Sequence, residues 1–269
     1  MTLDMLDRLR RRVEAVAGPL CVGIDPDPRR LPSGLTADLR GVETFAMGLL
    51  EVAAEHAAAV KLNAAFYEAL GPDGWSLLAR LRRATPRELV FVLDAKRGDI
   101  GSTAERYADA AFGVIDADAV TLSPYLGEDA IEPFLEHPGR GVYVLARTTN
   151  PSAGRVQSLT VEGVPLYLHV ARWVAERWTD GRVGLVVGAT SPEALREIRE
   201  QVPGPPFLVP GIGAQGGDLE TAARACNGTR GPGLVAVSRG IAEASRGDDW
   251  LAAAHAEADR VVAALRDAV

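Results

Sequence analysis

The chain contains only two lysines, Lys61 and Lys96, against twenty-seven arginines. Each lysine lies near the end of a short apolar run, 59–63 for the first and 90–96 for the second. A guanidinium is planar and permanently charged, whereas an ammonium is compact and can give up its proton. One interpretation is that codon bias favours arginine and that the two lysines remain by chance. We favour the other, in which the chemistry needs a small cation that donates a proton.

Acidic side chains stand at the ends of the same kind of apolar run. Asp25 ends the run 22–25, and Asn63 follows Lys61 by two residues. Asp94 precedes Lys96 by two residues, so both side chains are expected on the same side of an extended backbone. This alternation of carboxylates and ammonium groups indicates a charged pocket.

A glycine-containing turn with a further carboxylate follows Lys96. Glycines on both sides of Asp99 permit a sharp turn, and Asp99 and Thr103 share a face if that turn is helical. The structural alternative is that Ser102 and Glu105 form a capping box and that Asp99 only solvates the loop. We favour a functional role for Asp99.

Two later segments have the character of a phosphate site. Residues 211–218 are rich in glycine and include Gln215, and Ser238, Arg239 and Gly240 follow a second apolar run. Glycine-rich backbone exposes amide hydrogens, and barrel enzymes often bind phosphate at the loops after their seventh and eighth strands. Arg239 would add a cation that can bind phosphate through two nitrogens.

Eight near-continuous apolar runs must position these residues. They cover 20–25, 58–63, 89–94, 119–123, 141–147, 182–188, 206–210 and 233–238. Such runs are typical of parallel strands that are covered on both faces. Most of the polar residues named above lie at or just after the carboxyl ends of these runs, where barrel enzymes place their active sites.

Helical patterns alternate with the strands. They cover 44–56, 74–83, 103–115, 129–137, 166–178, 192–201, 218–225 and 249–265, and 1–16 reads as an amphipathic helix. Thr190 and Glu193 suggest a capping box for the sixth of these helices. The order predicts one (β/α)8 TIM barrel over 1–269 with an extra N-terminal helix. A doubly wound sheet is the rival, but no Gly-x-Gly-x-x-Gly follows the first strand.

Composition excludes several classes of protein. The net charge is −7 without a broad basic region, so we expect no nucleic-acid partner. No apolar run approaches the roughly 20 residues that span a bilayer, so we expect no membrane partner. Two cysteines without metal-ligand spacing predict a reducing, cytoplasmic setting. The four histidines all fall in or at the ends of helical segments, so we expect no metal ligands or acid–base roles among them.

The motifs together resemble the orotidine 5′-phosphate decarboxylase family. The most specific is LDAKRGDI at 93–100, and the others are GID at 23–25, VKLN at 60–63, PGIGAQGG at 210–217 and SRGI at 238–241. LSPY at 122–125 and RTTNPS at 147–152 look like the longer bacterial subgroup. The resemblance runs from about residue 21 to 241, with the motifs in the family's order.

The resemblance implies roles for the charged residues. Lys96 is the implied proton donor in an alternating array of Lys61, Asp94, Lys96 and Asp99. Asp99, Ile100 and Thr103 are implied to reach across a homodimer interface into the partner's site. No cofactor and no metal are implied.

The resemblance also implies how orotidine 5′-phosphate and its product, uridine 5′-phosphate, are bound. Asp25 and Lys61 would hold the ribose hydroxyls. Gln215 and Arg239, with Ser238 and Gly240, would hold the phosphate. Thr149, where many members have serine, would contact the pyrimidine edge.

The implied reaction needs electrostatic help from the protein. Loss of carbon dioxide from carbon 6 of the pyrimidine leaves a carbanion in the ring plane, which the π system cannot delocalise. A fixed ammonium would stabilise that charge and then donate the proton. The carboxylates beside Lys96 favour its charged form, whereas a Schiff-base lyase needs a neutral amine.

Two other functions stay open at this point. One is a metal-dependent sugar-phosphate decarboxylase or lyase on a related barrel, which shares an Asp-x-Lys-x-x-Asp core. The other is a protein that binds nucleotide phosphates without catalysis. The intact array of Asp and Lys residues argues against the second, because uncompensated charges in a pocket are costly.

Overall fold

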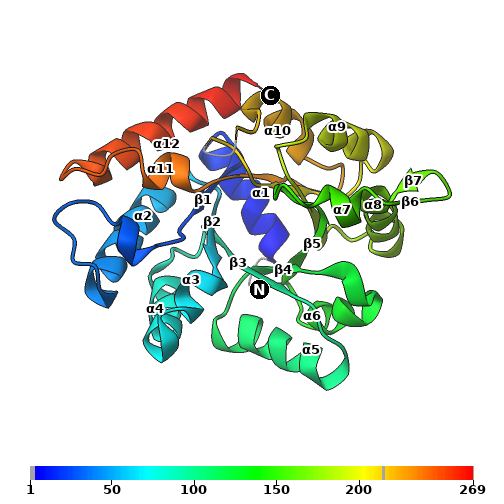
Figure 1. Ribbon diagram of the computed structural model, residues 1–269, viewed down its shortest axis with the longest axis horizontal. Helices are drawn as coiled ribbons and strands as arrows, with labels where there is room; N and C mark the ends of the chain where they lie inside the picture. The colour runs from blue at the N-terminus through cyan, green and yellow to red at the C-terminus, as the bar shows by residue number, and fades with distance from the viewer. Residues whose placement is uncertain (1–3, 214–215, 269) are drawn as a thin grey trace.

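Eight parallel strands close into a barrel in this structure, a computed structural model that describes residues 4–213 and 216–268. The order around the barrel is β1-β10-β9-β8-β5-β4-β3-β2. The bounds are β1 Leu20–Gly23, β2 Ala59–Asn63, β3 Val90–Arg97, β4 Ala119–Leu122, β5 Gly141–Arg147, β8 Val183–Val187, β9 Phe207–Val209 and β10 Leu234–Val237. The predicted (β/α)8 barrel is confirmed, and Figure 1 shows the helices arranged around its strands.

The helices mostly follow the strands in alternation. The α-helices are α1 Met5–Ala15, α2 Leu39–His56, α3 Ala64–Glu68, α4 Gly71–Ala84, α5 Gly101–Ala108, α6 Glu132–Leu135, α7 Gly154–Gln157, α8 Leu166–Arg177, α9 Pro192–Gln201, α10 Leu219–Cys226, α11 Arg239–Ala242 and α12 Trp250–Asp267. Short 3₁₀ turns are η1 Pro28–Arg30, η3 Pro124–Leu126 and η4 Glu128–Ala130, and η2 Asp109–Val114 is a π-helix. None of the helices in the described ranges is long and apolar enough to cross a membrane.

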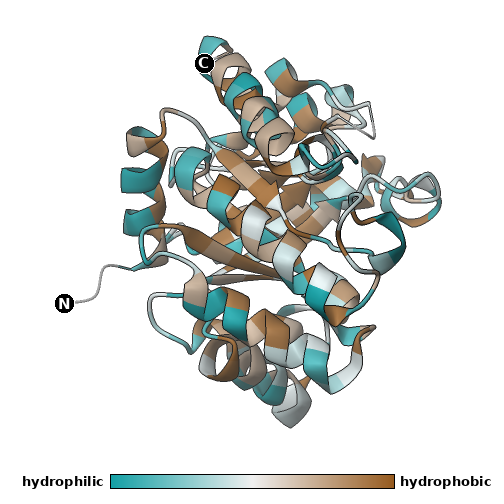
Figure 2. Ribbon diagram, turned by 90° about the vertical axis from the view of Figure 1, so that its left-hand side faces the viewer, coloured by the Kyte–Doolittle hydropathy of each residue, from teal (hydrophilic) through white to brown (hydrophobic). Residues whose placement is uncertain are grey.

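The apolar runs form strands because both of their faces are buried. One set of strand side chains packs outward against the helices, and the other set fills the interior of the barrel. Figure 2 shows the apolar strands enclosed by helices that turn polar residues outward. The small antiparallel pair β6 Thr160–Val161 and β7 Val164–Pro165 stands apart from the barrel sheet.

The extra N-terminal helix closes the amino end of the barrel. Met5 and Leu9 of α1 are buried in the same cluster as the interior strand residues. A Cβ at Gly141 would lie 2.0 Å from the Met5 side chain, so the helix meets β5 at a glycine. Arg8 also pairs with the buried Asp118 at the start of β4. The amino end of the barrel is therefore closed, and a binding cavity can open only at the other end, where the strands finish.

Three local predictions were wrong. Helix α9 has Ser191 as its N-cap and no side-chain capping bond, so Thr190 and Glu193 form no capping box. The predicted helix 129–137 is reduced to η4 and the four-residue α6. Strand β3 runs three residues past its predicted end, to Arg97, and its register against β4 shifts between Leu93 and Arg97.

Candidate active site

A cavity of about 430 Å³ lies at the carboxyl ends of the strands. Its volume is within the range of small-molecule sites. The lining includes most of the residues predicted from sequence, namely Asp25, Lys61, Asp94, Lys96, Thr149, Ser238 and Arg239. Residues from strands on opposite sides of the barrel thus meet in one cavity.

Lys61 is the buried ammonium of the site. It lies on β2 and is 6% exposed. Its Nζ donates to Asp94 Oδ2 over 3.2 Å and lies 4.0 Å from Asp25 Oδ2. Burial alone would lower the pKa of Lys61, but the charges of Asp25 and Asp94 outweigh it and raise that pKa. Lys61 is therefore a permanent cation between two carboxylates.

Asp94 connects the two lysines. It lies on β3 and is 8% exposed, and its Oδ1 accepts hydrogen bonds from Lys96 Nζ at 2.6 Å and from the Thr121 hydroxyl at 2.8 Å. Burial would raise the pKa of this carboxyl, but the charges of Lys61 and Lys96 lower it to about 2. The carboxylate is therefore ionised at any ordinary pH.

Lys96 reaches this network from an irregular backbone. Its φ is +47°, a left-handed conformation that residues other than glycine adopt rarely and at a cost. Asp94 and Lys96 both lie in β3, but the backbone at Lys96 departs from the extended conformation expected there, and the two side chains still meet. The Lys96 side chain is 46% exposed and lines the cavity, so its ammonium lies between Asp94 and the open space.

Thr121 holds the bulge at Lys96, and the sequence analysis missed it. Its hydroxyl accepts the backbone N–H of Lys96 at 3.0 Å and donates to Asp94 at 2.8 Å. A single threonine thus ties together a backbone turn and a carboxylate. The available signal was a hydroxyl residue inside the predicted apolar run 119–123, where it needs a buried partner.

Asp25 connects β1 to the strands on either side. Its Oδ1 accepts the backbone N–H of Asn63 at 3.1 Å, and its Oδ2 accepts the Ser238 hydroxyl at 3.2 Å. The close approach of Ser238 requires a glycine on β1, because a Cβ at Gly23 would lie 1.7 Å from the Ser238 Oγ. The GID motif therefore has a packing reason as well as a chemical one.

The opposite wall of the cavity is formed after β9 and β10. Pro210, Gly211 and Ile212 line it, together with Ser238 and Arg239 at the start of α11. Gly240 is in α11, next to the lining residues. The predicted phosphate ligand Gln215 lies outside the described residues.

Two adjacent threonines after β5 line the cavity and differ in their contacts. The Thr148 hydroxyl accepts from Gln157 at 2.8 Å and donates to Asn150 at 2.6 Å. The methyl group of Thr149 lies against Gly188, where a Cβ would be 2.5 Å away. The Thr148 hydroxyl is therefore already hydrogen-bonded within the protein.

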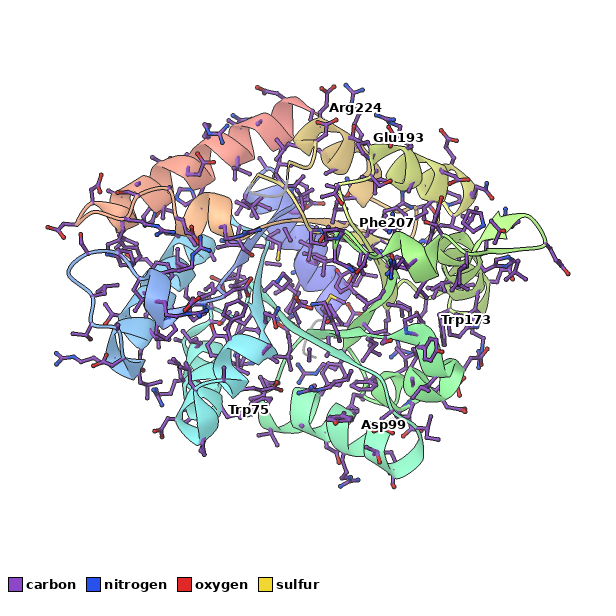
Figure 3. The ribbon with its side chains drawn as sticks, in the orientation of Figure 1. Trp75, Asp99, Trp173, Glu193, Phe207 and Arg224 are labelled. Atoms are coloured by element: carbon purple, nitrogen blue, oxygen red, sulfur yellow. The ribbon has the colours of Figure 1, made fainter. Side chains whose placement is uncertain are left out.

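Asp99, Ile100 and Thr103 lie away from the cavity of their own chain. Figure 3 shows Asp99 at the periphery beside α5. Its carboxylate accepts the backbone N–H of Ile100 at 2.9 Å, and Ile100 is 53% exposed. Ile100 is the N-cap of α5 and has no side-chain capping bond, so the alternative capping box at Ser102 does not form. Within one chain, Asp94 is thus the carboxylate that holds Lys96.

The fold and the site define a class: (β/α)8-barrel enzymes that hold lysines and carboxylates at the strand ends, opposite a glycine-rich wall. The model of one family matches residues 18–254, and its description is orotidine 5′-phosphate decarboxylase / HUMPS. The chain belongs to this family.

Relatives across most of the chain agree with this assignment. An orotidine 5′-phosphate decarboxylase of Roseiflexus sp. strain RS-1 is 50% identical over 253 residues, which cover 93% of this chain and 91% of the relative. One from Herpetosiphon aurantiacus is 42% identical and covers 93% of each chain. The structure of Leishmania donovani OMP decarboxylase superposes with a TM-score of 0.84 at 39% identity, covering 99% of this chain and 100% of that one.

Proposed function

We propose that this chain converts orotidine 5′-phosphate to uridine 5′-phosphate and carbon dioxide. The observation that supports it most is the Lys61–Asp94–Lys96 network, which lies in one cavity with Arg239. The relatives reported above are decarboxylases of this nucleotide. Neither the sugar-phosphate lyase nor the silent binding protein gains support from them.

In this proposal Lys96 stabilises the carbanion electrostatically and donates the proton. Its ammonium faces the cavity while Asp94 holds it by a hydrogen bond of 2.6 Å. A cation fixed in advance stabilises the carbanion at carbon 6 without reorganisation, and it then supplies the proton. Asp94 would also repel the substrate carboxylate, and loss of carbon dioxide removes that repulsion.

The other lining residues would bind the substrate around the reacting carbon. Asp25 and Lys61 would hold the ribose hydroxyls, and Arg239 would hold the phosphate with Gln215, Ser238 and Gly240. Thr149 would contact the pyrimidine, because the neighbouring Thr148 hydroxyl is engaged by Gln157 and Asn150. Binding energy at the remote phosphate would position the pyrimidine at Lys96.

An ultraviolet assay that follows loss of orotidine 5′-phosphate tests this function. We expect turnover that is unchanged after exhaustive chelation, because the charged groups of the site belong to the protein. Loss of turnover on chelation would favour the metal-dependent lyase. Tight binding of uridine 5′-phosphate without consumption of substrate would favour the silent binding protein.

Arg239→Ala is expected to raise KM by roughly 10- to 100-fold, since a hydrogen-bonded ion pair to phosphate is lost. The value of kcat is expected to change much less, because Arg239 lies on the opposite wall from Lys96. Steady-state kinetics measure both constants. Arg260→Ala is the matched control, since Arg260 is an exposed arginine that pairs with Glu257 on α12. Unchanged affinity in Arg239→Ala would refute the phosphate assignment.

The proposal includes a homodimer with shared sites. Asp99, Ile100 and Thr103 are not among the cavity-lining residues of their own chain, so they are free to complete the site of a partner. Exposed apolar side chains support an interface there. Ile100 begins α5, Tyr125 and Leu126 lie in η3, and η4 contacts both of these elements.

Mixing two inactive variants tests the shared site. Each proposed site takes Lys96 from one chain and Asp99 from the other. In a mixed dimer of Lys96→Ala and Asp99→Ala, one site therefore carries both substitutions and the other carries neither. Random exchange of subunits is expected to restore about one quarter of wild-type activity. Lys96→Ala mixed with Lys61→Ala is the control and should restore none, because those lysines come from the same chain. If the subunits are shown to exchange and no activity is restored, the proposal of shared sites is contradicted.

We also propose a cytoplasmic location. Cys21 and Cys226 are both buried and free, which accords with a reducing compartment.

A further inference from the structure

A cluster of histidine and carboxylate side chains lies between α2 and α12, outside the proposed active site. Glu55 and His56 end α2, and His255 lies in the first half of α12. The chain enters β2 three residues after His56, so the cluster lies toward the amino end of the barrel. The cavity opens at the other end. The sequence analysis expected no metal ligands among the histidines, but the fold brings two of them together.

The three ligand atoms converge on one point. His56 Nε2 lies 3.0 Å from His255 Nδ1, His255 Nδ1 lies 3.3 Å from Glu55 Oε2, and His56 Nε2 lies 3.9 Å from the same oxygen. The point equidistant from these atoms is about 2.0 Å from each of them, which is the ordinary length of zinc bonds to nitrogen and carboxylate oxygen. One metal ion can therefore reach all three ligand atoms.

The hydrogen bonds of the two rings leave room for either a proton or a metal ion at this point. The other ring nitrogen of His56, Nδ1, lies 3.1 Å from Asp259 Oδ1, and an ionised carboxylate accepts the N–H there. In the tautomer with its proton on Nδ1, the Nε2 of His56 presents a lone pair toward His255 and Glu55. Two ring nitrogens and a carboxylate oxygen cannot face one another without a proton or a metal ion between them.

The surroundings favour a bound cation. The His56 side chain is only 10% exposed, so its ring is held by packing. A carboxylate behind a ligating histidine fixes the tautomer and the orientation of the ring, and Asp259 has that place. The last turn of α2 adds the negative end of a helix dipole.

We propose that Glu55, His56 and His255 bind a divalent transition-metal ion, with Zn²⁺ as the best match to two imidazoles and one carboxylate. Water completes the coordination on the exposed side. The ion joins the end of α2 to α12, which carries the C-terminal part of the chain onto the barrel. Its effect is on stability, and it takes no part in the decarboxylation.

Zinc titration of the untagged, metal-stripped full chain tests the site. Isothermal calorimetry is expected to show one ion per chain, and His255→Gln or His56→Gln should weaken binding by more than about 100-fold, since each removes a ligand. Asp259→Asn keeps all three ligands and should weaken binding about tenfold through His56. His169→Gln is the matched control. Within the described residues, the one hydrogen bond of the His169 ring is with the Val161 carbonyl.

A second readout guards against variants that fold poorly. Glu55→Gln changes an exposed side chain, so it should fold normally and still lose affinity. Saturating zinc should raise Tm by about 5 °C in the wild type and not in the ligand variants. Turnover of orotidine 5′-phosphate should be the same with and without zinc, so failure of this site leaves the proposed reaction untouched. Absence of stoichiometric zinc binding, or wild-type zinc affinity in both histidine variants, would show that a proton alone joins the rings.

Discussion

Replacing Lys96 by alanine is expected to lower turnover by at least about 10⁴-fold while leaving affinity for uridine 5′-phosphate within a few-fold of wild type. In the proposed reaction the ammonium both stabilises the carbanion and protonates it, so one substitution removes two contributions to the rate. Binding should be spared because Asp25, Lys61 and Arg239, which are proposed to hold the ribose and the phosphate, lie on or just after other strands and also line the cavity. Single-turnover kinetics and a binding titration measure the two effects separately.

Lys96→Arg is the informative comparison. It keeps the positive charge, but its guanidinium is wider and holds its proton too firmly to donate it. Turnover should therefore remain close to that of the alanine variant. Near-normal rates in either variant would remove Lys96 from the mechanism.

Asp94→Asn is expected to lower turnover by roughly 10²- to 10³-fold and to destabilise the fold by about 3 kcal/mol, because Lys61 stays buried with a weaker partner. Asp25 is then the nearest carboxylate to Lys61, at 4.0 Å. The kinetic loss has a geometric cause, since Lys96 Nζ loses the charged acceptor that fixes it. Kinetics and urea unfolding at neutral pH measure the two losses.

The pH dependence of this destabilisation has a definite sign. The pKa of Asp94 is about 2 in the folded chain and about 3.9 when unfolded, so its contribution is full above about pH 4 and is lost as the pH falls toward 2. The gap in unfolding free energy between wild type and Asp94→Asn should shrink over that window. A gap that stays constant would contradict the assigned ion pairs.

Thr121→Val serves as the control for charge. It removes the hydroxyl that joins Asp94 to the Lys96 backbone but leaves every charge in place. A loss of about tenfold in kcat with little change in KM would identify Thr121 as a positioning residue. A loss as large as that of Asp94→Asn would mean that the bulge, more than the carboxylate, sets the reactive geometry.

The strands could be predicted well because their burial dictates their composition. The predicted range 141–147 coincides with β5, and the other seven predicted strands have ends within three residues of those observed. Parallel strands bury both faces, so each must be apolar throughout and is easily distinguished from its polar ends. Asp94, Lys61 and Asp25 could be placed at the cavity for the same reason, since they interrupt or end such runs.

The errors arise where tertiary contacts override local patterns. No propensity predicts a left-handed lysine, because Lys96 adopts that backbone only while Thr121, on the next strand, accepts its N–H. Thr121 itself was missed because its partners are 25 and 27 residues away. The pairing of His56 with His255 likewise depends on the packing of α2 against α12, which a linear pattern does not show.

The helix α1 has a consequence for how reactants move. Met5 and Leu9 fill the amino end of the barrel, and within the described residues the cavity lining lies at the strands' carboxyl ends. Carbon dioxide released beside Lys96 must then escape through the same mouth by which the nucleotide enters. The gas must pass the nucleotide that remains in the cavity, so slow release of that nucleotide would also delay the gas and expose the new carbon–hydrogen bond to the reverse reaction.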